Sequence, residues 1–173
     1  MKHILNLKFL ILFVIIVLAV LSRFLPFPPN FAPVAALALF GGAVFKDRRL
    51  AFLLPLAVML ISDLFLGLHS TLLFVYASFG LIVFIGMWAG KNLNPLRLTG
   101  AALSGSVLFF VVTNFGVWLT SPFYPLNPAG LIACYTAAIP FFHYTALGDL
   151  FYTAVIFGSY EMARRTVPEF AQA

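Results

Sequence analysis

The sequence has very little charge. Only 9% of its 173 residues are charged, 10 basic and 5 acidic, whereas a soluble globular domain carries about 25%. Hydrophobic residues make up 63% of the chain, and the mean hydropathy is +1.08. So few charged side chains cannot cover the apolar surface of a soluble domain of this size. The composition excludes a soluble enzyme domain, a disordered tail and a nucleic-acid-binding module, and it predicts an integral helical membrane protein.

Chemical motifs are also scarce. The single cysteine, Cys134, cannot form an internal disulfide or a four-ligand zinc site. The sequence has no Gly-x-Ser-x-Gly, His-Glu-x-x-His, Walker or Cys-x-x-Cys motif. We therefore predict that the protein is not an enzyme, and we expect no catalytic residues, no metal site and no cofactor.

Long apolar segments dominate the chain. Six of them cover about residues 5–25, 31–45, 50–67, 72–90, 98–120 and 146–163, and a further stretch covers 129–142. A membrane-spanning helix needs about 20 residues, so we expect the second segment to be a short or tilted span and the stretch 129–142 to be a half-helix at one surface. The runs lack the alternation of β-barrel strands. The predicted fold is all-α, a polytopic transmembrane helical bundle with six spans, in a single domain over residues 1–173.

The first segment has two interpretations. Its strictly apolar run covers residues 9–21 and follows Lys2 and Lys8, a pattern that also describes a signal peptide. No Ala-x-Ala cleavage site follows the run, which continues into Ser22-Arg23-Phe24. We therefore expect a retained helix, with cleavage as the alternative.

Basic residues predict the orientation of the spans. They cluster before the first span, between spans two and three, between spans four and five, and after span six: Lys2, Lys8, Lys46, Arg48, Arg49, Lys91, Arg97, Arg164 and Arg165. With six spans and both termini in the cytoplasm, all of these lie on the cytoplasmic side and only Arg23 lies outside, in agreement with the positive-inside rule. We expect a multi-pass protein of the cell inner membrane.

Polar residues within the spans are the main functional signal. A carboxylate deep in a span costs about 2.5–3.5 kcal/mol on insertion scales, so an intramembrane acid is a functional candidate. Two acids qualify, Asp63 and Asp149. On this topology both lie in the outer half of the membrane, and polar and aromatic side chains from distant segments lie there too. We expect these groups to line one outward-facing cavity that binds a small ligand: Asn30, Asp63, His69, Asn114, Trp118, His143, Tyr144, Asp149 and Tyr152.

Each candidate also has a purely structural interpretation. Asp63 could cap a neighbouring helix or pair with His69, and Asn114 could bond a backbone carbonyl. The histidines could be solvated at the interface, and Asp149 could be favoured by the dipole of a helix start. The proline-rich outer segments 26–30 and 121–128 could form a pocket rim or an interfacial aromatic belt.

Small residues recur at a spacing of four, for example Ala38 and Gly42, or Gly86 and Gly90. Residues four apart share a helix face, so such pairs let a second backbone approach closely. They serve either packing within the bundle or docking of a partner membrane subunit, for which the second span is the best candidate.

Several motifs carry a resemblance to known proteins. They are Asn30-Phe-Ala-Pro-Val-Ala-Ala-Leu-Ala-Leu-Phe-Gly-Gly-Ala43, Lys46-Asp-Arg-Arg49, Leu60-Ile-Ser-Asp-Leu64, Val112-Thr-Asn-Phe-Gly-Val-Trp118 and Gly148-Asp-Leu-Phe-Tyr152. The chain resembles an uncharacterised family of small bacterial membrane proteins. More remotely, it is similar to the S components of energy-coupling factor (ECF) vitamin transporters, which have six helices, a short alanine-rich helix, a basic turn and a helix ending near Ser-Asp.

The resemblance to S components implies a function in uptake. It implies an outward-facing pocket for a vitamin-like ligand and a membrane face that docks a transmembrane coupling subunit driven by ATPases, although solitary versions also occur. One departure concerns the docking face, because the alanine motif of S components lies in the first span and the small residues here crowd the second.

We therefore expect an integral membrane protein that captures a small ligand from outside and helps to import it. Two carboxylates without a nearby arginine favour a neutral or cationic ligand. One alternative is a non-catalytic structural or assembly subunit, which predicts paired acids and no cavity. The other is a proton-coupled secondary carrier, which predicts water access from both sides.

Overall fold

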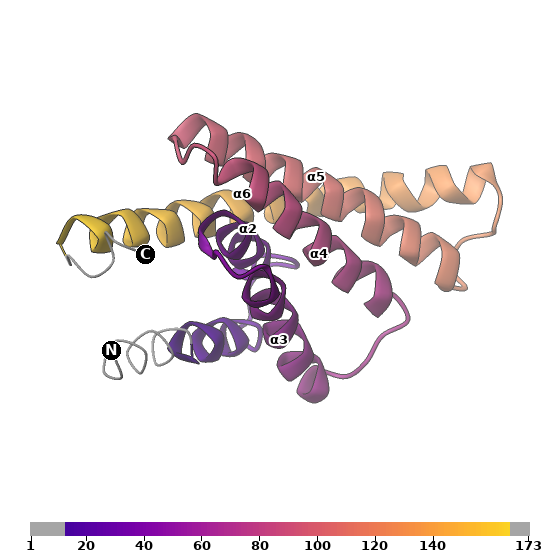
Figure 1. Cartoon of the computed structure of the whole chain (residues 1–173). Helices are drawn as coiled ribbons and strands as arrows, with labels where there is room; N and C mark the ends of the chain where they lie inside the picture. The colour runs from indigo at the N-terminus through magenta and orange to yellow at the C-terminus, as the bar shows by residue number, and fades with distance from the viewer. Residues whose placement is uncertain (1–12, 167–173) are drawn as a thin grey trace.

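The computed structural model describes residues 13–166, which form six helices and no strand (Figure 1). The helices are Phe13–Ser22, α2 (Val34–Val44), α3 (Arg48–Leu66), α4 (Leu72–Ala89), α5 (Pro95–Thr120) and α6 (Pro128–Thr166). The all-α prediction is confirmed for these residues. Lys2, Lys8 and the beginning of the predicted first span, residues 5–12, lie outside the described residues.

Four of these helices, α3, α4, α5 and α6, are long and apolar enough to cross a membrane. The other two, α2 and Phe13–Ser22, are apolar but shorter. The membrane character expected from the composition therefore rests on four helices, each of which overlaps one predicted span.

The predicted half-helix over residues 129–142 is wrong as a separate element. The structure continues it without a break into the last span, as one helix of 39 residues that is about 58 Å long at 1.5 Å per residue. The half-helix was predicted because the stretch 129–142 is too short to span a membrane, but a short apolar stretch can be part of a longer helix. Proline can end a helix, yet Pro140 lies inside α6. Residues 131–147 contain no glycine that could favour a break.

Side-chain caps and one glycine set the helix ends. Asp47 and Asn94 precede α3 and α5, and their side-chain oxygens accept hydrogen bonds of 2.8 Å from the amides of Arg49 and Arg97, as good N-cap residues do. At the other end of α3, Gly67 has a φ of 100°, which a glycine adopts without steric cost. The α2–α3 and α4–α5 turns, which carry basic residues, therefore each end in a well-capped helix start.

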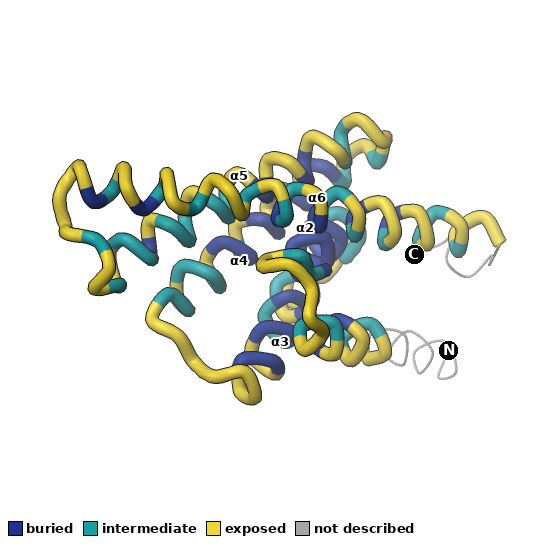
Figure 2. The backbone as a smooth tube through the Cα atoms, turned by 180° about the vertical axis from the view of Figure 1, so that it is seen from behind, coloured by how far each residue is buried: buried dark blue, intermediate teal, exposed yellow. Residues whose placement is uncertain are grey.

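The short helix α2 is the centre of the bundle. It packs against α3, α4, α5 and α6, and every residue from 34 to 42 is buried, as the dark tube of α2 in Figure 2 shows. Its closest neighbour is α4. A Cβ atom on Gly42 would lie 2.1 Å from the carbonyl oxygen of Val83, and one on Gly86 would lie 2.3 Å from that of Leu39, so the two backbones touch.

The small residues of α2, which were the candidate docking face for a partner subunit, are buried in this packing. Ala36 and Ala38 are completely buried, and Gly90 lies against the backbone of Ala43. The docking face considered for the second span is therefore wrong, because α2 presents that stripe to its own chain. Small residues at spacing four predict a close contact but do not identify the contacting helix.

The connections separate into two ends of the molecule (Figure 1). The described start of the first helix, the α4–α5 turn and the end of α6 lie at one end, while the α3–α4 and α5–α6 connections lie at the other. Contact between Gly90 and Ala43 brings the α2–α3 turn beside the α4–α5 turn. The described basic clusters therefore gather at the first end.

Candidate functional site

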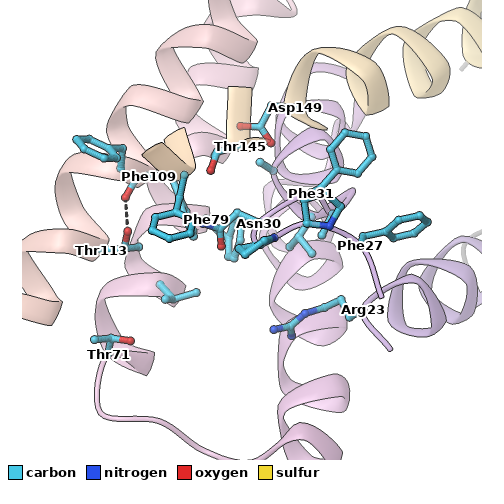
Figure 3. Close-up of a pocket in the computed structure, with 18 of the residues that line it drawn as sticks. Arg23, Phe27, Asn30, Phe31, Thr71, Phe79, Phe109, Thr113, Thr145 and Asp149 are labelled. Carbon is cyan, nitrogen blue, oxygen red and sulfur yellow. Dashed lines mark hydrogen bonds between the residues drawn. The ribbon is translucent and has the colours of Figure 1, made fainter. Parts of the chain in front are cut away.

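A cavity of about 540 Å³ lies in the half of the bundle away from the basic turns. Its walls come from the connection before α2, the end of α3, the first half of α4, the second half of α5 and the middle of α6 (Figure 3). The volume falls within the range of about 300–1,000 Å³ that is usual for small-molecule sites.

Aromatic rings form much of the cavity wall. Phe79 of α4 and Phe109 of α5 contact each other with ring centroids 5.3 Å apart, and both line the cavity (Figure 3). Phe31 lines the cavity from the connection before α2 and packs against Phe151 and Tyr152 of α6, at centroid distances of 5.9 and 5.5 Å. Aromatic packing of this kind gives a wall of fixed shape.

The connection before α2 lines the cavity, and its backbone turns sharply at Asn30. This residue has a φ of 63°, the only positive φ outside glycine in residues 13–166, and asparagine tolerates that conformation better than most residues. The turn brings Phe31 against α6, where a Cβ atom on Gly148 would lie 3.1 Å from the Phe31 Cα atom. The missing side chain of Gly148 thus lets the connection approach α6 next to Asp149.

The first buried acid, Asp63, is paired with Arg23. The Nη1 atom of Arg23 lies 2.7 Å from Asp63 Oδ1, and only 1% of the Asp63 side chain is exposed. Tyr76 donates a 3.1 Å hydrogen bond to the other carboxylate oxygen, and Arg23 also donates to the hydroxyl of Ser62. The expectation that neither acid has a nearby arginine is therefore wrong for Asp63, and so is the alternative pair with His69.

Arg23 itself lines the cavity and was missed as a site residue. One signal pointed to it, because it was the one basic residue that the predicted topology left outside the cytoplasmic clusters. An isolated cation among apolar spans needs a partner, and Asp63 is that partner.

The second buried acid, Asp149, has no cationic partner among the described residues. It is 2% exposed and lines the cavity beside Thr145, one helical turn earlier (Figure 3). Ser106 of α5 lies 2.6 Å from Asp149 Oδ2. One turn further along α6, the buried hydroxyl of Thr153 has no hydrogen-bond partner in the described part of the chain. The two buried acids therefore have different electrostatic surroundings.

The structure brings four predicted site residues to the cavity wall, namely Asn30, His69, Asn114 and Asp149. The Nδ1 atom of His69 lies 2.9 Å from the hydroxyl oxygen of Thr71. The Asn114 amide donates a 2.8 Å hydrogen bond to the carbonyl of Phe110, as its structural interpretation expected, and still borders the cavity. Asp63 contacts the cavity only through Arg23.

Four other predicted residues do not line the cavity. The Trp118 indole donates a 3.0 Å hydrogen bond to the carbonyl of Pro125 and so ties the end of α5 to the α5–α6 connection. Tyr152 packs behind Phe31. His143 and Tyr144 contact each other, with ring centroids 3.8 Å apart. Both lie on a different face of α6 from Phe142, Thr145 and Asp149, because successive residues of a helix point about 100° apart.

Residues 13–166 contain no group of three or more histidine, cysteine, aspartate or glutamate side chains that could hold a metal ion. Cys134 is buried in α6, with its sulfur 3.5 Å from the carbonyl oxygen of Asn114. The polar groups of the site can therefore bind through hydrogen bonds and charge, within walls that are largely aromatic.

These features define an all-helical protein of membrane type with an aromatic-walled cavity among its helices. The chain belongs to a family of unknown function (DUF6580), whose model matches residues 3–170. Comparison with curated proteins finds no match, and comparison with solved structures finds none either. Membership of an uncharacterised family agrees with the first resemblance seen in the sequence, whereas the remote similarity to S components stays a prediction.

Proposed function

We propose that the protein binds a small ligand in this cavity and takes part in its uptake across the inner membrane. In this proposal the chain crosses the membrane six times, with both termini in the cytoplasm. The gathering of the basic turns at one end of the bundle supports this orientation. The cavity, in the other half, then faces outward.

One observation carries the proposal: polar side chains from separate segments meet at a single cavity of suitable size. Asn30, Asn114 and Asp149 come from the connection before α2, from α5 and from α6. Aromatic walls supply binding energy through burial, and a few polar groups fix the orientation of the ligand. Because Asp63 balances the charge of Arg23, Asp149 is the acid left to interact, so we propose a neutral or cationic ligand.

S components of ECF transporters remain the model for how such a protein would work. A vitamin-like ligand would be captured from outside, and a transmembrane coupling subunit with ATPases would drive its release inside. The other function kept from the sequence is a structural or assembly subunit. The pairing of Asp63 with Arg23 favours it, but the cavity does not, because that function predicts solid packing between the helices.

Ligand binding to the purified protein tests the proposal. The full chain in detergent would be screened by thermal unfolding against water-soluble vitamins and their precursors, with mass spectrometry of any co-purified molecule. The decisive variant is Ala138→Trp, which fills the cavity from α6. Its control is Ala137→Trp, at an exposed neighbouring position outside the cavity wall.

We expect at least one compound to raise the midpoint of unfolding of the parent and of Ala137→Trp, but not of Ala138→Trp. Uptake is refuted as the function of this cavity if no compound stabilises the parent and nothing co-purifies. It is refuted equally if Ala138→Trp binds the compound as tightly as Ala137→Trp does.

A further inference from the structure

The two buried acids differ in what neutralises them. Asp63 contacts the guanidinium group of Arg23 and the hydroxyl of Tyr76. Asp149 has a single side-chain hydrogen bond among the described residues, to Ser106. A carboxylate that is buried in an apolar bundle without a cation is costly in its charged form. Asp149 therefore needs another source of positive charge.

None of the elements packed around Asp149 supplies that charge. Helices α2 and α4 contain no charged residue, and the one charged residue of α5, Arg97, lies at its far end beside Trp88. Arg23, in the segment that leads to α2, is committed to Asp63. On α6 the next charged residue after Asp149 is Glu161, more than three turns away.

Uncharged titratable groups near the site do not fill the role either. Tyr76 of α4 donates to Asp63, and Tyr152 of α6 packs against the ring of Phe31. His69 is exposed and contacts Thr71, and His143 lies outside the cavity wall. Within residues 13–166, no side chain supplies the charge balance at Asp149, which leaves that role to a proton or a molecule in the cavity.

The hydrogen bonds around Ser106 accommodate one additional proton. Its hydroxyl oxygen lies 2.6 Å from Asp149 Oδ2 and 3.1 Å from the carbonyl oxygen of Ala102, but a hydroxyl has one hydrogen for these two acceptors. A protonated carboxyl group donates one hydrogen bond. With a proton on Oδ2, Asp149 donates to Ser106 and Ser106 donates to Ala102, so each acceptor has its own hydrogen.

We propose that Asp149 is a proton-binding site in the cavity wall, occupied at neutral pH when the cavity is empty. The cavity gives the proton its path, because Asp149 lines it directly (Figure 3). Loss of the proton leaves one negative charge facing the cavity, so the protonation of Asp149 sets the charge that any occupant meets. This site concerns the empty protein and is independent of which ligand the proposed function involves.

Infrared spectroscopy of the full chain in a detergent without carbonyl groups tests the site directly. Protonated carboxyl groups absorb at a frequency well separated from that of carboxylates, and the chain has only five acidic residues. Asp149→Asn removes the proposed site, and Glu161→Gln, which removes a half-exposed acid of the same helix, is the control. Ser106→Ala keeps the acid and removes its hydrogen-bond partner.

At pH 7 we expect a protonated carboxyl band in the parent and in Glu161→Gln, its loss in Asp149→Asn, and its shift to higher frequency in Ser106→Ala. The shift provides a test even where Asp149→Asn fails to fold. A parent without the band overturns the proposal, and so does a band that survives in folded Asp149→Asn or stays unshifted in Ser106→Ala. None of these outcomes depends on the ligand screen, so the proton site and ligand uptake can fail separately.

Discussion

Arg23 and Asp63, 40 residues apart in sequence, form a partly buried ion pair that joins the segment after the first helix to α3, with 2.7 Å between Nη1 and Oδ1. The segment that continues from Arg23 forms a large part of the cavity wall. The pair therefore holds this wall in place.

Removing one partner of this pair should destabilise the protein more than removing both. We expect Arg23→Gln or Asp63→Asn alone to cost about 3–5 kcal/mol of unfolding free energy, because an uncompensated charge or acceptor stays buried. The double variant should cost clearly less than the sum. Chemical denaturation of the four proteins in detergent gives the coupling energy. Strictly additive losses would show that the two side chains do not interact.

Contact between the α2 and α4 backbones predicts a large effect of one methyl group. In Gly86→Ala the new Cβ atom would lie 2.3 Å from the Leu39 carbonyl oxygen, so the helices must separate, and we expect a loss of about 1–3 kcal/mol. Gly100→Ala is the control, because a Cβ atom there meets no atom within 4 Å. It should be neutral or slightly stabilising through helix propensity. Equal midpoints of thermal unfolding for the two variants would contradict this packing.

The buried hydroxyl of Thr153 should be dispensable for folding. It has no hydrogen-bond partner within residues 13–166, and a buried hydroxyl without a partner is unfavourable compared with an apolar group of similar shape. Thr153→Val is therefore expected to leave the midpoint of thermal unfolding unchanged or to raise it. A decrease would mean that the hydroxyl has a partner in the folded protein.

Substitutions of Trp118 and Asn114 should differ in their effect on ligand binding, although both residues were site candidates from the sequence. Trp118→Phe removes the hydrogen bond to Pro125 but touches no cavity wall, so we expect it to change the dissociation constant less than twofold, on the order of 0.4 kcal/mol. Asn114→Ala alters the wall and should weaken binding by about tenfold, the worth of one good hydrogen bond. Titration of a stabilising compound from the screen measures both. A larger effect of Trp118→Phe than of Asn114→Ala would indicate that the ligand binds near the α5–α6 connection instead.

Much of the fold follows from local sequence, because apolar runs and helix caps act over a few residues. Asp47 and Asn94 mark the starts of α3 and α5, and both helices begin within three residues of the predicted spans. The continuity of α6 was missed, since the apolar stretch 129–142 is too short to form a span by itself and its junction with the last span carries no local signal.

The site was harder to predict than the helices. Depth in the membrane brought Asn114 and Asp149 to the same level, but depth does not tell which way a side chain points. Trp118 follows Asn114 by one turn, and its indole reaches Pro125 instead. The pairing of Arg23 with Asp63 depends on where the first helix lies against α3, which no local pattern encodes.

The shortness of α2 has a further consequence for a chain embedded in lipid. Its 11 residues span only about 16 Å, roughly half of the hydrocarbon thickness of about 30 Å. In the proposed six-span topology, the polypeptide that leads into it runs non-helically at a depth where unbonded amide groups are costly. Residues 26–33 include four prolines, which have no amide hydrogen to leave unbonded. The prolines that prevent a helix here therefore also reduce the number of unbonded amide groups that would be exposed to lipid.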